Sequence, residues 1–139
     1  MKTIGLILAL MVANLVATAQ ESKGVDIIVT IENVLSDEGI IIGALHSTET
    51  FMRGPGVINE TINASKGEVT LTFSDVSPGT FAIMILHDSN SNQRMDYEAN
   101  GMPKESFVTS GSPAQYGPPT FNDAKFEVDN EDLELKLRF

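Results

Sequence analysis

The 139-residue chain contains no cysteine and no tryptophan. Without a thiol it can form no disulfide, no thiolate metal site and no lipid-modified N-terminal cysteine. Basic residues are also scarce, because nine Lys and Arg stand against nineteen Asp and Glu and the formal net charge is −10. Nucleic acids and anionic membranes bind to clustered basic side chains, so we expect neither as a partner.

Helical periodicity and catalytic motifs are missing as well. Beyond residue 20 no segment spaces its apolar residues at the three- and four-residue intervals of an amphipathic helix. No Gly-rich phosphate loop follows a predicted strand, and no serine lies in a nucleophile elbow. We therefore do not expect an enzyme. A hydrolase that activates His46 or His87 beside an acid stays open as an alternative.

A short apolar segment begins the chain. Lys2 precedes an apolar stretch at residues 4–16, and Ala17 and Ala19 give the small-x-small arrangement that signal peptidase accepts. We predict a signal peptide at residues 1–19 and a periplasmic or secreted protein. The stretch is shorter than the roughly 20 apolar residues that span a bilayer, so we expect no membrane insertion after cleavage. Loss of Lys2 changes the net charge from −10 to −11.

Residues 20–139 are expected to form a single domain, because their number suits one hydrophobic core. Apolar and polar residues alternate with the period of half-buried strands. Clear strands are predicted at 25–34, 39–47, 68–76, 80–87, 124–129 and 133–139, with weaker ones at 56–62 and 106–110. Seven or eight strands joined by turns rich in Gly, Pro, Asn and Asp predict an all-β, antiparallel, immunoglobulin-like sandwich. A small barrel is the alternative. We expect a monomer.

The predicted strand at 80–87 is followed by the polar stretch "HDSNSNQRMDYEANG". Asp88, Asn90, Asn92 and Asp96 occupy positions one, three, five and nine of a calcium-binding loop, and the carbonyl of Arg94 occupies position seven. In such a loop alternate residues direct their oxygens toward one centre. The spacing therefore predicts a metal site at these five residues, with calcium as its ion.

Two positions of this loop depart from the calcium pattern. Position six is normally Gly because its φ is positive, and here it is Gln93. Position twelve, where a bidentate Glu completes the shell, is Ala99. We expect weak binding, with a dissociation constant of about 10⁻⁴ to 10⁻³ M. The alternatives are a turn held by Asp and Asn side chains without an ion, or another metal.

The two long loops, residues 88–105 and 111–123, are the other places to look for function. The second contains Tyr116 and Phe121 on either side of a rigid Pro pair. Such loops could form the rim of a carbohydrate- or peptide-binding module whose ligand is a glycan or another protein. Packing of the aromatics against the sandwich is the alternative.

His46 and His87 are the only histidines, and each ends a predicted strand. His87 shares the parity of the apolar residues of its strand, so its ring is expected at the edge of the core. Both are expected to be structural histidines. A zinc site on the two rings is the alternative, but no third ligand is placed by the spacing.

With these residues in view, the chain resembles a family of exported bacterial proteins defined as a domain of unknown function, DUF2141. The resemblance lies in a Pro-Gly-Thr turn, an aromatic-led strand, a His-Asp pair, alternating polar residues and a Gly-x-Pro-Lys-Glu segment. Here these are Pro78–Thr80, Phe81, His87 and Asp88, Asn90, Asn92, Arg94–Asp96 and Gly101–Glu105. The loop is also similar to calcium loops of bacterial adhesin repeats, and the strand start is similar to transthyretin-type sandwiches. The resemblance implies a sandwich and a possible ion, but no reaction.

Overall fold

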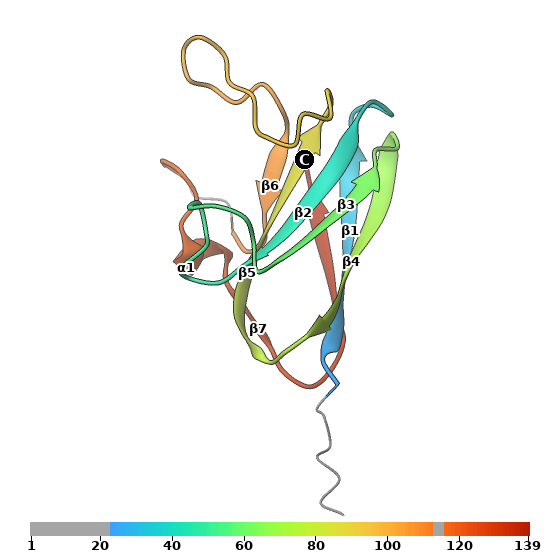
Figure 1. Cartoon of the computed structure of the whole chain (residues 1–139), viewed down its shortest axis with the longest axis vertical. Coiled ribbons are helices and arrows are strands. Elements are labelled where there is room, and N and C mark those ends of the chain that lie inside the picture. Colours follow the sequence, from blue (N-terminus) through green and yellow to red (C-terminus); the bar gives the residue numbers. More distant parts are fainter. Residues whose placement is uncertain (1–22, 113–115) are drawn as a thin grey trace, which may run out of the picture.

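The computed structural model describes residues 23–112 and 116–139, and the predicted signal peptide at residues 1–19 lies outside them. Two β-sheets face each other and enclose the main hydrophobic core (Figure 1). The predicted β-sandwich is therefore confirmed. The strands are β1 (Val25–Val34), β2 (Ile40–His46), β3 (Ile58–Asn63), β4 (Gly67–Val76), β5 (Gly79–Asp88), β6 (Phe107–Thr109), β7 (Phe126–Val128) and β8 (Leu133–Arg138).

The smaller sheet has the order β4-β1-β8. Its β1 and β4 are antiparallel, whereas β1 and β8 are parallel. The expectation of a wholly antiparallel sandwich is therefore wrong for this pair. No hairpin joins the two strands, so nothing in the local sequence sets their relative direction. Their pairing places the buried β1 residues Ile27, Val29 and Ile31 beside Leu133, Leu135 and Leu137.

The larger sheet has the order β3-β2-β5-β6, and β7 pairs with the first residues of β5. Strand β5 lies between β2 and β6, as its apolar sequence predicts. Its odd-numbered residues Ile83 and Ile85 join the main core. Its even-numbered residues point to the opposite face. That outer face carries the candidate site.

A second, smaller apolar cluster covers part of the outer face of β5. It consists of the buried Phe51, Ala82 and Ala124, with Met84 and Phe121 packed against them. Ala124 and Phe121 belong to a single helical turn, α1 (Phe121–Ala124), which the apolar pattern of the sequence does not predict. Four residues are too few to show a helical period. The Thr120 side chain, which accepts the N–H of Asp123 as N-cap, is the local signal for this turn.

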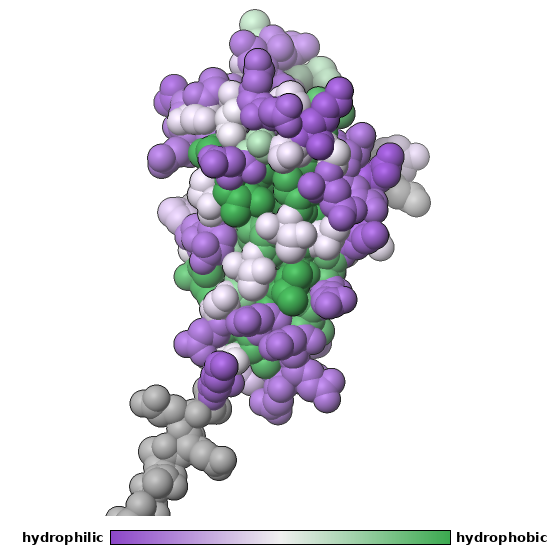
Figure 2. All heavy atoms as spheres, turned by 90° about the vertical axis from the view of Figure 1, so that its right-hand side faces the viewer, coloured by the Kyte–Doolittle hydropathy of each residue, from purple (hydrophilic) through white to green (hydrophobic). Residues whose placement is uncertain are grey.

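Figure 2 shows the side on which β3 and β4 lie in Figure 1. Hydrophilic residues surround a stripe of hydrophobic and near-neutral residues on this side. Here β3 and β4 contribute the partly buried Ile58, Ile62 and Val69 to the edge of the main core. Across residues 23–112 and 116–139, no helix has the length and hydropathy needed to traverse a bilayer.

Candidate functional site

The even-numbered residues of β5, among them Ala82, Met84 and Asp88, lie on the outer face of the larger sheet. Ala82 is buried in the small apolar cluster, Met84 is partly exposed, and Asp88 is fully buried at the end of the strand. Because residues two apart share one face of a strand, all three point away from the main core. The strand thus presents a packed end, an open apolar centre and a buried carboxylate along one line.

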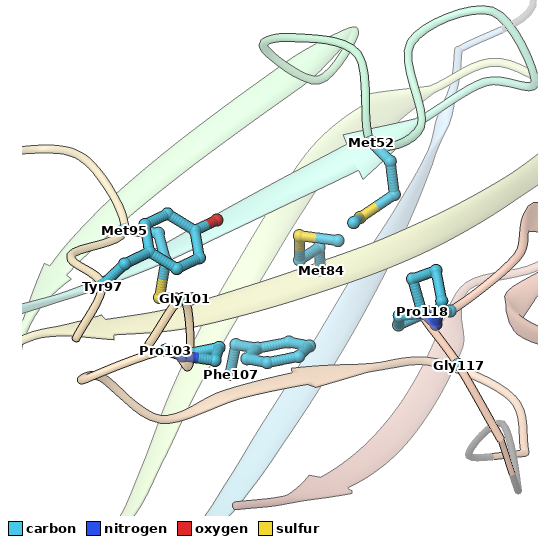
Figure 3. Close-up of a pocket in the computed structure, with 10 residues that line it drawn as sticks. Met52, Met84, Met95, Tyr97, Gly101, Pro103, Phe107, Gly117 and Pro118 are labelled. Carbon is cyan, nitrogen blue, oxygen red and sulfur yellow. The ribbon is translucent and has the colours of Figure 1, made fainter. Parts of the chain in front are cut away.

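A pocket of about 460 Å³ opens over the centre of this line. Met84 from β5, Met52 from the β2–β3 connection and Phe107 from β6 lie around it (Figure 3). The two long loops supply the remaining walls. The described residues of the lining are Met52, Met84, Met95, Tyr97, Gly101, Pro103, Phe107, Gly117, Pro118 and Pro119.

The pocket exposes large apolar side chains to solvent. The exposed fraction is 54% for Met52, 60% for Tyr97 and 37% for Phe107. Pockets of 300 to 1,000 Å³ (roughly) with a mostly hydrophobic lining are typical ligand sites. Among the described side chains that line this pocket, the Tyr97 hydroxyl is the one polar group. The pocket therefore suits an apolar group better than a strongly hydrated one.

Both long loops reach the pocket, where the sequence places the rim of a binding module. Met95, Tyr97 and Pro103 come from the loop at residues 88–105. The loop at residues 111–123 supplies Gly117, Pro118 and Pro119, and its residues 113–115 lie outside the described part of the chain. The aromatics of this second loop separate, because Phe121 packs on Phe51 while Tyr116 is exposed.

The polar loop is anchored by Asp88. Its Oδ1 accepts the backbone N–H of Asn92 at 3.2 Å, and its Oδ2 accepts that of Gln93 at 2.6 Å. These bonds satisfy a carboxylate that is fully buried. A buried charge without such partners would be strongly unfavourable, so Asp88 fixes the conformation of the turn that follows β5.

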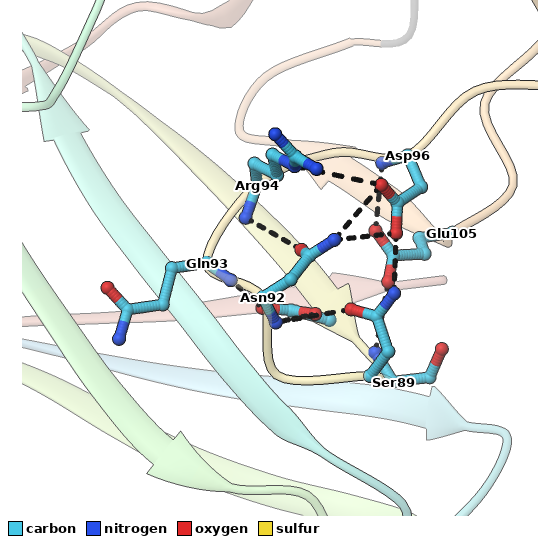
Figure 4. A network of polar contacts seen from close by, with 8 residues as sticks. Ser89, Asn92, Gln93, Arg94, Asp96 and Glu105 are labelled. Carbon is cyan, nitrogen blue, oxygen red and sulfur yellow. Dashed lines mark hydrogen bonds and ion pairs between the residues drawn. The ribbon is translucent and has the colours of Figure 1, made fainter.

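The other predicted ligands form one hydrogen-bonded network (Figure 4). The side-chain amides of Asn90 and Asn92 both donate to the Asp96 carboxylate, at 2.6 to 3.0 Å. The oxygens of these two amides accept backbone N–H groups of Asn92 and Arg94, respectively. Hydrogen bonds from Asn90 and then Asn92 hold the pKa of Asp96 below its ordinary value of 3.8. The structure thus brings Asn90, Asn92 and Asp96 together.

Glu105 is a member of this network that the loop spacing does not reveal. Its Oε1 accepts the backbone N–H of Ser89 at 3.2 Å, and its Oε2 accepts that of Asp96 at 3.1 Å. The side chain is buried and joins the two ends of the polar loop. Its position in the Gly-x-Pro-Lys-Glu segment, nine residues after Asp96, is the sequence signal that marks it.

The backbone at Gln93 has φ = 64°, and Ser91 has φ = 58°. The first value confirms that position six of the loop requires a positive φ even though its residue is not Gly. An L-residue in this region costs about 1 kcal/mol relative to Gly. The bond from Gln93 N–H to Asp88 holds the residue in this strained conformation.

The donor set has the chemistry of a calcium site, because carboxylate and amide oxygens dominate it. In the described conformation, however, the amide nitrogens of Asn90 and Asn92 face Asp96. An ion between these side chains would have to replace those bonds. Throughout the described residues no group of three His, Cys, Asp or Glu is placed to hold a metal ion. The arrangement resembles the alternative of a turn held by Asp and Asn side chains without an ion.

The histidines lie on opposite faces of the larger sheet. His87 pairs with Ile41, five residues before His46 on β2, so the two rings are separated by about 17 Å along the strand. His46 Nδ1 lies 3.1 Å from Thr50 Oγ1, and His87 Nε2 lies 2.9 Å from the carbonyl of Glu38. The alternative of a zinc site on both rings is therefore wrong. The partners of His46 Nδ1 and His87 Nε2 are thus a hydroxyl and a backbone carbonyl, and neither is a carboxylate.

Comparison with known proteins gives one family. A family model described as "Uncharacterized protein conserved in bacteria (DUF2141)" matches residues 29–136. Neither the curated proteins nor the solved structures provide a match to this chain. The similarity to transthyretin-type and adhesin-repeat sandwiches is not confirmed by these comparisons.

Proposed function

Since the chain belongs to the bacterial family DUF2141, whose description names no activity, we propose a function from the pocket itself. The protein is an exported binding module, and its pocket takes up apolar side chains of a peptide or protein partner. The observation that carries this proposal is the cluster of exposed apolar side chains between the two long loops. No reaction is proposed.

The lining favours a peptide over a carbohydrate. Every sugar hydroxyl that enters a pocket must exchange its hydrogen bonds with water for bonds with protein groups. Among the described residues that line the pocket, Tyr97 alone offers a polar side-chain group for this purpose. Methionine adapts its shape to varied apolar partners, and three methionines line this pocket. An apolar peptide side chain therefore gives up fewer hydrogen bonds with water when it enters the pocket than a sugar does.

A second candidate function belongs to the polar loop. Its oxygens and the positive φ of Gln93 follow the pattern of a calcium loop, and we infer weak calcium binding by Asp88, Asn90, Asn92, the carbonyl of Arg94, and Asp96. The ion would stabilise the loop that also supplies Met95 and Tyr97 to the pocket. Calcium would thus order one wall of the binding site.

An array of immobilised peptides and glycans, probed with residues 20–139, tests the main proposal. Wild-type protein is expected to bind peptides with aromatic or branched apolar side chains and to leave the glycans unbound. Tyr97→Ala and Phe107→Ala should each weaken peptide binding by about tenfold, because each removes apolar contact area from the wall.

Leu35→Ala is the matched control, since Leu35 and Tyr97 have the same exposed fraction of 60% and Leu35 does not line the pocket. This variant should bind as wild type does. If the protein bound only the glycans, the proposed peptide ligand would be wrong and the ligand would be a carbohydrate. Equal binding by all three variants would show that the pocket is not the binding site.

A further inference from the structure

Methionine is distributed unevenly in this protein. The chain has six methionines, of which Met1 and Met11 precede the described residues. The main core between the sheets contains Val, Ile, Leu, Phe and Ala but no Met. Met52, Met84 and Met95 all line the pocket on the outer face of β5. The fourth described methionine, Met102, is exposed on the loop at residues 88–105, which also carries Met95. A residue used only as an apolar core filler would not be concentrated in this way.

The sulfur atoms suggest a second role for the pocket. Thioether sulfur is a soft, neutral ligand that selects Cu(I) over hard cations such as calcium and magnesium. We infer that Met52, Met84 and Met95 bind one Cu(I) ion through their sulfur atoms. The strong bias toward acidic residues, with a net charge of −10, favours the approach of a cation to the protein.

The three methionines come from separate segments that meet at the pocket. Met84 lies on β5, Met52 on the β2–β3 connection and Met95 on the loop after β5. Figure 3 shows the side chains of Met52 and Met84 directed toward each other, while Met95 lies apart from them in the part of the lining that Tyr97 and Gly101 form. Met52 is exposed and Met95 is half-buried. Each has three rotatable side-chain bonds, so their sulfur atoms can turn toward a common ion.

The described part of the chain places no other soft or nitrogen side-chain ligand in the lining of this pocket. The chain has no cysteine, and His46 directs its Nδ1 to Thr50 while His87 lies on the core side of the sheet. The lining residues that the structure describes include no carboxylate, which calcium or magnesium would require. A site built from thioethers alone therefore discriminates for Cu(I) and its chemical analogue Ag(I).

This inference does not depend on the proposed peptide binding. Cu(I) binding needs the sulfur atoms, whereas peptide binding needs the apolar volume. Leu has a volume and polarity close to those of Met, so Met→Leu substitutions preserve the apolar lining and remove the metal ligands. The two proposals can consequently fail separately.

Competition with a chromophoric Cu(I) chelator, bicinchoninate, under nitrogen with ascorbate tests the inference on residues 20–139. Wild-type protein should withdraw one equivalent of Cu(I) from the chelator. Met52→Leu, Met84→Leu and Met95→Leu should each weaken binding by at least about tenfold, because loss of even an outer partner of a metal ligand costs that much. Ag(I), which is stable in air, should shift the methyl NMR signals of the same three methionines.

Met102→Leu is the matched control, because Met102 is an exposed methionine of the same loop that does not line the pocket. It should retain wild-type affinity, and circular dichroism should show that all four variants remain folded. Failure of wild-type protein to compete would overturn the inference. So would undiminished competition by the three pocket variants, which would place the ion elsewhere on the acidic surface.

Discussion

The backbone N–H of Gln93 donates to Oδ2 of Asp88 at 2.6 Å. This bond joins a fully buried carboxylate at the end of β5 to a residue whose φ is 64°. The carboxylate offsets the strain of the left-handed residue, and the turn directs the chain toward the pocket. The conformation of one pocket wall therefore begins at Asp88.

Asp88→Ala should destabilise the fold by about 2 kcal/mol, because the backbone N–H of Gln93 loses its acceptor and that of Asn92 keeps only the side-chain oxygen of Asn90. Asp88→Asn keeps one acceptor oxygen and should cost about half as much. Urea unfolding followed by circular dichroism measures both values. Equal stability of wild type and Asp88→Ala would show that the carboxylate does not hold the turn.

Gln93→Gly should stabilise the protein by about 0.5 to 1 kcal/mol, since Gly adopts positive φ without steric cost. Arg94→Gly is the control: Arg94 is the next residue and is not among those with positive φ. That substitution should destabilise the protein slightly, because Gly loses more backbone entropy on folding. Chemical unfolding of both variants decides the matter, and destabilisation by Gln93→Gly would contradict the strain argument.

Burial lowers the pKa of His46 below its ordinary value of 6.5, and hydrogen bonding to the Thr50 backbone opposes this shift only in part. The unfolded chain then binds a proton more tightly than the folded protein does. The contribution of His46 to stability is therefore complete above pH 6.5 and declines as pH falls through this value toward the lowered pKa. The midpoint of thermal unfolding should fall as the pH is lowered from about 7.5 to about 5, and the midpoint of the His46→Gln variant should fall less. Identical slopes would exclude His46 as the cause.

Calcium should raise the thermal midpoint by a few degrees at about 10 mM, the shift expected for a dissociation constant near 10⁻³ M. Asp96→Ala should abolish this rise, because Asp96 receives both loop amides and is a candidate ligand. Glu134→Ala, which removes an exposed carboxylate of β8, should preserve it. A midpoint that calcium and chelator leave unchanged in wild type would leave the loop as a turn held by its own side chains.

Much of the fold follows from the sequence because half-buried strands alternate visibly. The eight strands were predictable in this way, and the ends of the short ones at β6 and β7 differ by one or two residues. The parallel pairing of β1 with β8 was not predictable, since these strands are about a hundred residues apart and no turn connects them. The alternation of apolar and polar residues determines where a strand forms. The packing of the whole core determines which strand it pairs with.

The site divides in the same manner. The spacing of Asp88, Asn90, Asn92 and Asp96 predicts a polar cluster after β5, and the structure forms one. The participation of Glu105 was missed because a calcium loop ends before it. The pocket was missed except for its rim, because Met52 and Met84 come together only when β2 and β5 pair and the loop after β2 folds over the sheet.

Methionine methyl NMR tests the binding pocket most directly, because the described methionines report on it residue by residue. Residues 20–139 labelled with ¹³C at the methionine methyls are titrated with N-phenyl-1-naphthylamine, a neutral apolar probe. The signals of Met52, Met84 and Met95 should shift together along one binding curve, while that of Met102, which is outside the lining, stays in place. If the three pocket signals remain still, or shift no more than Met102, the pocket does not bind apolar groups and the proposed function is wrong.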